Sequence, residues 1–149
     1  MQAFIVFSLS LILCCSFVAC GYSDCGSEDG AIVSLEITGC SNTAKRCILK
    51  RNTNSTLVLS FTSNVESSSL TAVVHGVILG VPMPFDLPNP DCCKDSGITC
   101  PVASGQTYKY EGTFPILGSY PRVTVDIKWE IKDKDGKDIV CALIPAKIG

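Results

Sequence analysis

Apolar and polar residues alternate along much of this chain, with the period of two that is typical of a half-buried β-strand. The clearest case is Arg122–Lys132, in which every second residue from Val123 is apolar and the others are polar or charged. Ala31–Ile37, Thr56–Ser63 and Thr71–Leu79 alternate in the same way. The residues expected to share one face of these segments are Val33, Leu35 and Ile37; Leu57, Leu59 and Phe61; and Val73, Val77 and Leu79, with Val74 and Ile78 opposite.

Turn signals separate these segments. Asp133-Lys134-Asp135-Gly136 predicts a hairpin turn, and Ile139–Pro145 then returns as a strand. No segment has convincing helical periodicity. Many short strands with polar loops between them predict an all-β fold, a sandwich of two antiparallel sheets. The predicted loops are Ser41–Arg46, Asn52–Ser55, Asn64–Ser69 and Ala103–Gln106.

The most informative segment begins as an apolar strand at Val73 and then breaks into closely spaced prolines, of which Pro82 and Pro84 come first. Proline lacks the N–H that a central strand needs, so this segment must lie at a sheet edge. We expect it to form the rim of a ligand cavity, with Val81, Met83 and Phe85 pointing one way.

The first 20 residues are almost wholly apolar and end in small residues, which predicts a secretory signal peptide cleaved after Cys20 or Gly21. Residues 21–149 then form one domain. A membrane anchor and a bacterial lipoprotein signal are the alternatives. Both are disfavoured, because the apolar run is short for a spanning helix and its start lacks basic residues.

Seven of the ten cysteines follow the predicted signal peptide, which in a secreted chain indicates a disulfide framework with one thiol left over. Spacing favours two local loops, Cys40–Cys47 and Cys93–Cys100, while Cys25 and Cys141 lie near the two ends. Six cysteines allow 15 connectivities, so spacing alone leaves the pairing open.

Charge and motifs argue against several function classes. The formal net charge is −2 and there is no basic stripe, so we expect no nucleic-acid partner. The only histidine, His75, has no nucleophile motif around it, and the cysteines lack the paired spacing of a zinc site. We therefore expect no enzyme activity, no metal and no cofactor. His75 is interpreted as a hydrogen-bonded strand residue, with a pH-sensitive element as the alternative. Asn54 begins a glycosylation sequon.

Several motifs together resemble the Niemann–Pick type C2 family of secreted lipid carriers, within the ML-domain (lipid-recognition) group. The resemblance covers essentially the whole chain after the signal peptide. Its most specific part is Gly80-Val81-Pro82-x-Pro84-Phe85, followed by Pro90-Asp91-x-Cys93-Lys94. The other matching motifs are Asp24-Cys25-Gly26-Ser27, Phe61-Thr62-Ser63-Asn64, Ala72-Val73-Val74-His75-Gly76, Tyr120-Pro121 and the strand with Trp129.

The resemblance implies an immunoglobulin-like β-sandwich with a lipid in an apolar cavity between its sheets. It also implies the pairs Cys25–Cys141, Cys40–Cys47 and Cys93–Cys100, which leaves Cys92 as the odd thiol. Phe85, Ile116 and Tyr120 match positions around the ligand at the cavity mouth, and Trp129 matches a position on the strand beside it. Leu79, Val81 and Met83 match an apolar patch that contacts membranes or a receptor, with Asp91 and Lys94 as flanking polar positions.

The function that the resemblance implies is a monomeric, secreted carrier that binds a sterol and transfers it between membranes or to a membrane receptor, in lysosomes or in extracellular fluid. Two alternatives remain. Ala142 stands where the mammalian pattern has a large aromatic residue, which favours a carrier of fatty acids or small signalling lipids. A lipid-sensing module of innate immunity would instead have a stable protein partner.

Overall fold

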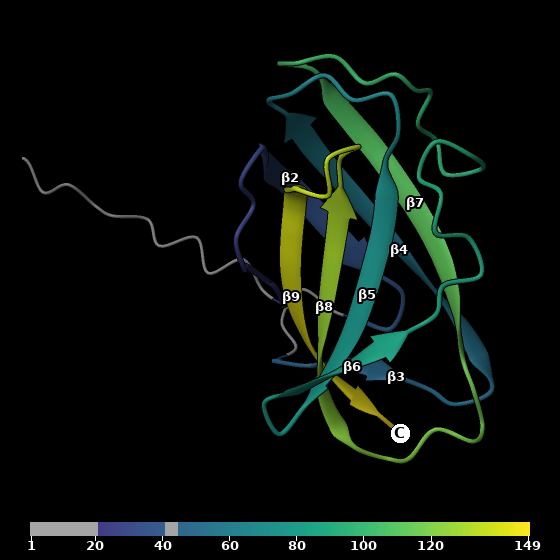
Figure 1. The fold of residues 1–149 in the computed structure, drawn as a ribbon. Helices are drawn as coiled ribbons and strands as arrows, with labels where there is room; N and C mark the ends of the chain where they lie inside the picture. Colours follow the sequence, from purple (N-terminus) through teal and green to yellow (C-terminus); the bar gives the residue numbers. More distant parts are fainter. Residues whose placement is uncertain (1–20, 41–44) are drawn as a thin grey trace, which may run out of the picture.

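The computed structural model describes residues 21–40 and 45–149, so the predicted signal peptide and most of the Ser41–Arg46 loop lie outside the described residues. Nine strands form two sheets that face each other, with β5, β8 and β9 in one layer and β2, β4 and β7 in the other (Figure 1). The larger sheet has the order β1-β9-β8-β5-β6, with β3 also paired to β9. Its strands are β1 (Ser23–Asp24), β3 (Cys47–Leu49), β5 (Thr71–Ile78), β6 (Val81–Phe85), β8 (Thr124–Lys132) and β9 (Asp138–Ile148).

The smaller sheet contains β2 (Gly30–Ile37), β4 (Thr53–Ser63) and β7 (Thr107–Ile116), with β4 in the centre. All strand pairs are antiparallel except β3 with β9. This arrangement confirms the predicted all-β sandwich of two antiparallel sheets. The described residues include no helix that is long and apolar enough to cross a membrane.

The core lies where the alternating faces of β4 and β8 meet. Leu57, Leu59 and Phe61 are fully buried from one sheet, and Trp129 and Ile131 from the other, as their period-two spacing predicts. The Trp129 ring packs against the rings of Tyr110 and Phe114 of β7, with centroid distances of 6.1 and 5.5 Å. Aromatic contacts of this kind join the two sheets.

The expected face of Ala31–Ile37 was wrong at Val33. The pairing of β2 with β4 shifts register between Ile32 and Ser34, so that Val33 is left out of the ladder and is 58% exposed. A bulge of this kind adds one residue and reverses the alternation on one side of it. Ile32 therefore packs against the core in place of Val33, together with Leu35 and Ile37.

The assignment of Leu79 to a strand face was also wrong. Strand β5 ends at Ile78, which pairs with Val81, and Leu79 and Gly80 form the two-residue turn between β5 and β6. Both turn residues have positive φ, 50° and 77°, as a type I′ hairpin turn requires. Leu79 is 99% exposed at the tip of this hairpin.

Two predicted boundaries need adjustment. The Asn52–Ser55 segment is not a loop throughout, because β4 begins at Thr53, and Asn54 is an exposed strand residue that pairs with Pro115. The final strand runs beyond Pro145 to Ile148. The hairpin turn at Asp133–Gly136 is present, with Gly136 N–H donating to the Asp133 carbonyl at 3.0 Å.

Three disulfides have the pairing that the resemblance implies, Cys25–Cys141, Cys40–Cys47 and Cys93–Cys100. Cys92 is the free thiol within the described residues, and it is buried in the core. Burial, with a smaller effect of the Asp91 charge, raises the pKa of this thiol to about 12. Cys92 is therefore an inert packing residue at neutral pH.

Candidate functional site

The site begins at the edge strand β6. Its register with β5 pairs Gly76 with Met83 and Val74 with Phe85, and the two prolines alternate with these residues. Because Pro82 and Pro84 alternate with the other residues of β6, they remove N–H donors from the outer edge of the strand. Val81, Met83 and Phe85 keep their N–H groups for the bonds to β5. Strand β6 therefore ends the larger sheet, as predicted, and blocks further strand addition there.

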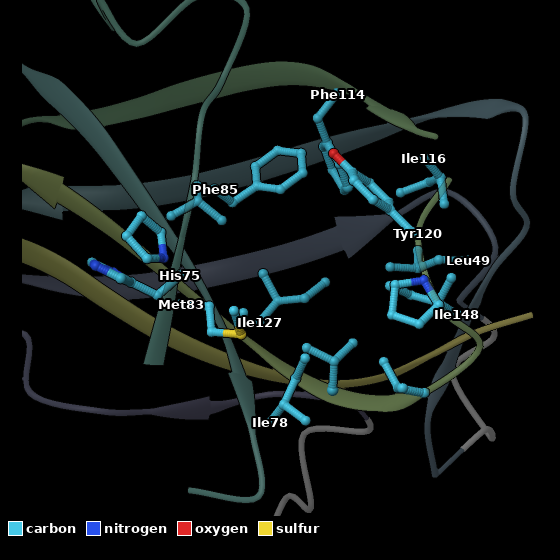
Figure 2. A pocket seen from close by; sticks show the side chains of 16 residues that line it. Leu49, His75, Ile78, Met83, Phe85, Phe114, Ile116, Tyr120, Ile127 and Ile148 are labelled. Atoms are coloured by element: carbon cyan, nitrogen blue, oxygen red, sulfur yellow. The ribbon is translucent and has the colours of Figure 1, made fainter. Parts of the chain in front are cut away.

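Between the sheets, next to β6, lies a cavity of about 220 Å³ (Figure 2). Its lining is almost wholly apolar. The inner part of the lining consists of buried side chains, which include Leu49, Val74, Phe114, Ile116, Val125 and Ile127. The outer part is partly or largely exposed and includes Met83, Phe85, Tyr120 and Pro121. The cavity therefore opens on the side of β6 and of the loop that follows β7.

Two aromatic residues meet at this opening, one from each side of the sandwich. Phe85 ends β6, and Tyr120 lies in the loop after β7; their rings contact edge-on with centroids 6.0 Å apart. Phe85 also contacts Phe114 deeper in the cavity at 6.1 Å. The Tyr120 hydroxyl lies on the side of the Phe85 ring in Figure 2. Partial burial, together with the charge of Asp86, raises the pKa of this hydroxyl.

His75 contributes to the cavity wall, but its imidazole does not enter the cavity. The register places His75 opposite Lys128 and Pro84, on the outer face of the larger sheet. Its ring nitrogen points away from the cavity in Figure 2. The imidazole Nδ1 lies 4.0 Å from Glu130 Oε1, which is too long for the predicted hydrogen bond.

The structure brings together three of the four residues predicted to contact ligand. Phe85, Ile116 and Tyr120 line the same cavity, with Ile116 buried beneath the opening. Trp129 does not line it, because it lies behind Phe114 in the core. Ala142 pairs with Trp129 and is equally buried, so its small side chain leaves no extra room in the cavity itself.

The predicted transfer patch is divided between two places. Leu79, Val81 and Met83 lie together on the β5–β6 hairpin beside the opening, and all three are largely exposed. Asp91 and Lys94 lie on the loop after β6. The Asp91 carboxylate accepts a hydrogen bond from the Cys93 N–H at 2.9 Å, which shapes the loop. Lys94 lines a separate, polar depression together with Glu111.

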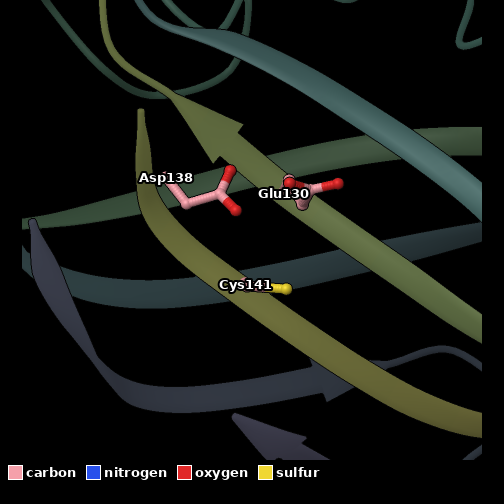
Figure 3. Close-up of side chains that lie close together, drawn as sticks. All are labelled: Glu130, Asp138 and Cys141. Atoms are coloured by element: carbon pink, nitrogen blue, oxygen red, sulfur yellow. The ribbon is translucent and has the colours of Figure 1, made fainter. Parts of the chain in front are cut away.

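A cluster of ionisable side chains on the outer face of the larger sheet was missed by sequence reasoning (Figure 3). Glu130 is buried although the alternation of β8 places it outside, and the Lys132 ammonium lies 3.1 Å from both Glu130 Oε2 and Asp138 Oδ1. Burial and hydrogen bonding to Glu130 raise the pKa of Asp138 to about 6. Burial opposes ionisation of Glu130 too, but hydrogen bonds from Asp138 and Lys132 hold its pKa below the usual value.

This cluster is an ion network and not a metal centre. The third side chain near the two carboxylates is Cys141, whose sulfur is bonded to Cys25 and cannot act as a thiolate ligand. The Lys132 ammonium lies between the two carboxylates and already offsets part of their charge. Asp138 lies beside Glu130 because of the register in which β8 and β9 pair. The spacing of the two residues in the sequence did not predict this contact.

Known proteins resemble this chain over nearly all of its described length. The ML-domain family profile matches residues 17–148. The "NPC intracellular cholesterol transporter 2 homolog a" of Drosophila melanogaster is 46% identical over 143 residues, which is 93% of this chain and 97% of that protein. The "Ecdysteroid-regulated 16 kDa protein" of Manduca sexta is 47% identical over 127 residues, 85% of this chain and 87% of that protein.

A solved structure has the same fold. The crystal structure of a Niemann–Pick type C2 protein from the Japanese carpenter ant superposes with a TM-score of 0.82 at 33% identity, and it covers 86% of this chain and 98% of the ant protein. Similarity of fold and similarity of sequence therefore point to the same group of proteins. The chain is a member of the ML-domain family and, within it, a homologue of the Niemann–Pick type C2 proteins.

Proposed function

We propose that this protein is a secreted carrier that binds a sterol in the cavity between its sheets and delivers it to a membrane or to a membrane receptor. The observation that carries the proposal is the apolar cavity that opens between Phe85 and Tyr120. The fruit fly relative, which is named as a homologue of a cholesterol transporter, supports a sterol as the cargo. No catalytic step is part of this function, because carriage needs only binding and release.

The driving force for binding is the transfer of the lipid from water to an apolar lining. A sterol has about 28 heavy atoms, and at about 0.3 kcal/mol per atom the binding free energy is about 8 kcal/mol, which corresponds to micromolar affinity. Such an affinity keeps a lipid in solution and still allows its release. Tyr120 brings a hydroxyl group to the apolar lining at the opening, and this group suits a ligand with a small polar end.

Transfer requires that the cavity opening approach a membrane. Leu79, Val81 and Met83 lie beside that opening and are 99%, 60% and 53% exposed. Exposed apolar side chains gathered at one place mark a contact site for a membrane or a protein. We therefore assign delivery to the β5–β6 hairpin. Asp91 and Lys94 lie on the loop after β6 and extend the contact only if the partner is a protein.

The proposal includes export from the cell. Residues 1–20 act as the signal peptide, residues 21–149 form the ML domain, and the mature protein works as a monomer outside the cell or in lysosomes. Three disulfides support an oxidising compartment. Asn54 is exposed on the outer face of β4 and is accessible for glycosylation.

The test is equilibrium binding of a naturally fluorescent sterol to the protein purified from a secreting host. Phe85→Ala removes the aromatic ring that closes the opening, and we expect it to weaken sterol binding at least tenfold. Val33→Ala is the matched control, because Val33 is exposed on β2 and does not line the cavity. This control should bind the sterol as tightly as the wild type does.

Other outcomes would redirect the assignment. If the protein binds oleic acid and a sterol does not compete, it is still a carrier, but its cargo is a slender lipid and not a sterol. Binding of neither lipid, together with a stable protein partner, would support the lipid-sensing module instead. Equal sterol affinity of wild type and Phe85→Ala would refute the cavity as the binding site.

A further inference from the structure

Tyr120 forms one side of the cavity opening, although it lies outside the strands, between β7 and β8. It is the last residue of a turn, residues 117–120, in which the Tyr120 N–H donates a hydrogen bond to the Leu117 carbonyl at 3.2 Å. The two central residues of this turn, Gly118 and Ser119, are exposed. The position of the Tyr120 ring therefore depends on what holds the 117–120 turn in place.

A second turn, residues 50–52 between β3 and β4, contacts the 117–120 turn. Arg51 Nη1 donates a hydrogen bond to the Gly118 carbonyl at 3.4 Å. The Asn52 N–H donates to the Ile116 carbonyl at 2.6 Å, directly before the 117–120 turn begins. The Asn52 side chain also lies so close to Gly118 that a methyl group on this glycine would clash with it. Two neighbouring residues of one turn therefore hold the other turn.

The 50–52 turn is itself fixed to the wall of the cavity. It directly follows Leu49 of β3, which lines the cavity beside Ile116 and Ile148 on the Tyr120 side (Figure 2). The Arg51 N–H donates to the Gly149 carbonyl at 3.2 Å, so the backbone of this turn is joined to the end of the larger sheet. The Arg51 side chain does not line the cavity. Arg51 thus connects a fixed part of the wall to the turn at the opening without touching the space that a ligand would fill.

The contact between Arg51 and Gly118 is weak enough to be released. Its length of 3.4 Å is beyond the usual range for such a hydrogen bond. A guanidinium carries several N–H donors, but among the described residues the buried Nε of Arg51 has no hydrogen-bond partner. The turn is therefore held by a side chain whose hydrogen-bonding capacity is only partly used, and separating the two costs little.

We propose that Arg51 is a positioning residue for lipid uptake, because it holds the 117–120 turn, and with it Tyr120, in the position that narrows the cavity opening. This inference rests on the proposed carrier function and names a residue that sets how fast the cargo enters and leaves. Since Arg51 does not touch the cavity, we expect its contact with Gly118 to be the same with and without a lipid. Losing the contact should then lower the barrier to opening for entry and release alike, and leave the affinity nearly unchanged.

The experiment measures association and dissociation of a naturally fluorescent sterol by stopped flow. In Arg51→Ala, both rate constants should rise about three- to fivefold, the factor that corresponds to one net hydrogen bond, while the dissociation constant stays within about twofold of the wild type. A residue that only supported the fold would change urea unfolding and leave these rates as they are. Arg51→Lys keeps a donor for the Gly118 carbonyl and should restore the wild-type rates.

The matched control is Arg46→Ala. Arg46 Nη1 also donates to a backbone carbonyl, that of Ala146 at 3.3 Å, and it forms an ion pair with Asp126, far along the chain from the 117–120 turn. This variant should exchange sterol at the wild-type rates. Gly118→Ala reaches the same turn by a different route, because the added methyl group would displace it from the Asn52 side chain. It should speed exchange as Arg51→Ala does, and it keeps the proposal testable if Arg51→Ala folds poorly.

A second measurement needs no ligand. The Tyr120 N–H is bonded within the turn, so its hydrogen exchange in the lipid-free protein should be faster in Arg51→Ala than in the wild type. Equal exchange of this amide in the two proteins would refute the positioning role.

The outcomes separate this inference from the function on which it rests. If Arg51→Ala takes up and releases sterol at the wild-type rates, the positioning role is refuted while the carrier function stands. The same holds if dissociation alone becomes faster and the affinity falls, since Arg51 would then support the bound state and not the opening. If the wild type binds no sterol, the carrier function fails, and the role of Arg51 in uptake is overturned with it.

Discussion

Replacing Asp138 by Asn tests whether the carboxylate network on the outer face makes the protein more stable in acid. The Asp138 carboxyl faces Glu130 and Lys132 of β8, while Lys128 and His75 approach Glu130 from its other side. Burial and the neighbouring Glu130 carboxylate raise the pKa of Asp138 to about 6. A carboxyl with a raised pKa binds its proton more readily in the folded state, so folding is stabilised as pH falls through 6.

The magnitude follows from linkage. With a pKa of about 6 in the folded protein and of 3.8 in the unfolded chain, Asp138 contributes about 1.3 kcal/mol more stability at pH 5 than at pH 7. The Asp138 side chain is 18% exposed, and water screens part of this effect, which leaves about 0.5–1 kcal/mol. Glu130 acts in the opposite direction, but only below its ordinary pKa of 4.5, because its pKa is lowered in the folded state. Stability should therefore peak near pH 5.

The assays are urea unfolding and thermal unfolding, each at pH 5.0 and pH 7.5. The wild type should be more stable at pH 5.0, and its thermal midpoint there should be about 2–4 °C higher. Asp138→Asn imitates the protonated carboxyl, so it should lose most of this difference. Asp29, whose pKa is also raised, by desolvation and by Asp133, acts in the same direction, and Asp29→Asn measures its share. The reasoning fails if the wild type is no more stable at pH 5.0, or if Asp138→Asn keeps the full difference.

Two further predictions concern the hairpin and the disulfides. Leu79→Asn should stabilise the fold by about 0.5–1 kcal/mol, because asparagine tolerates the positive φ of this turn. The same variant should slow sterol transfer to vesicles without changing sterol affinity. A stabilised variant that transfers sterol as fast as the wild type would contradict the membrane role of Leu79. Removing the Cys25–Cys141 disulfide, whose cysteines are 116 residues apart, should lower the free energy of unfolding by about 4–5 kcal/mol. Removing Cys40–Cys47, whose cysteines are 7 residues apart, should lower it by about 2.5 kcal/mol. Equal losses in urea unfolding of the two Cys→Ser double variants would refute the loop-entropy argument.

Period-two alternation was sufficient to predict the core strands, because one face of each is buried over its whole length. It succeeded for Leu57 and Leu59 in β4 and for Trp129 in β8. The prolines of β6 predicted an edge strand for an equally local reason, the missing N–H groups. Alternation failed at Val33, where two adjacent apolar residues fit either register, and only the pairing with β4 decides which one faces inward.

The site was less accessible to sequence reasoning. Ile116 and Tyr120 came from the family resemblance alone, whereas the prolines beside Phe85 already predicted that it lies at the rim of a cavity. Alternation identifies an inward side chain, but it does not tell whether that side chain meets the opposite sheet or a cavity. Val125 and Trp129 illustrate this limit: both point inward from β8, yet only Val125 lines the cavity. Asp138 approaches Lys132 and Glu130 only through the pairing of β8 with β9, so no sequence motif marked it.

The size of the cavity indicates where the protein must move to accept its proposed cargo. A volume of about 220 Å³ is below the roughly 300–1,000 Å³ of most small-molecule sites. The inner lining cannot yield easily, because it is continuous with the packed core around Trp129. At the opening, the contact between Phe85 and Tyr120 joins the two sides of the sandwich without a covalent link, as none of the three disulfides connects β6 to the loop after β7. Separation of these two rings is therefore the least costly way to enlarge the cavity, and the same movement that admits a lipid there would release it beside the exposed β5–β6 hairpin.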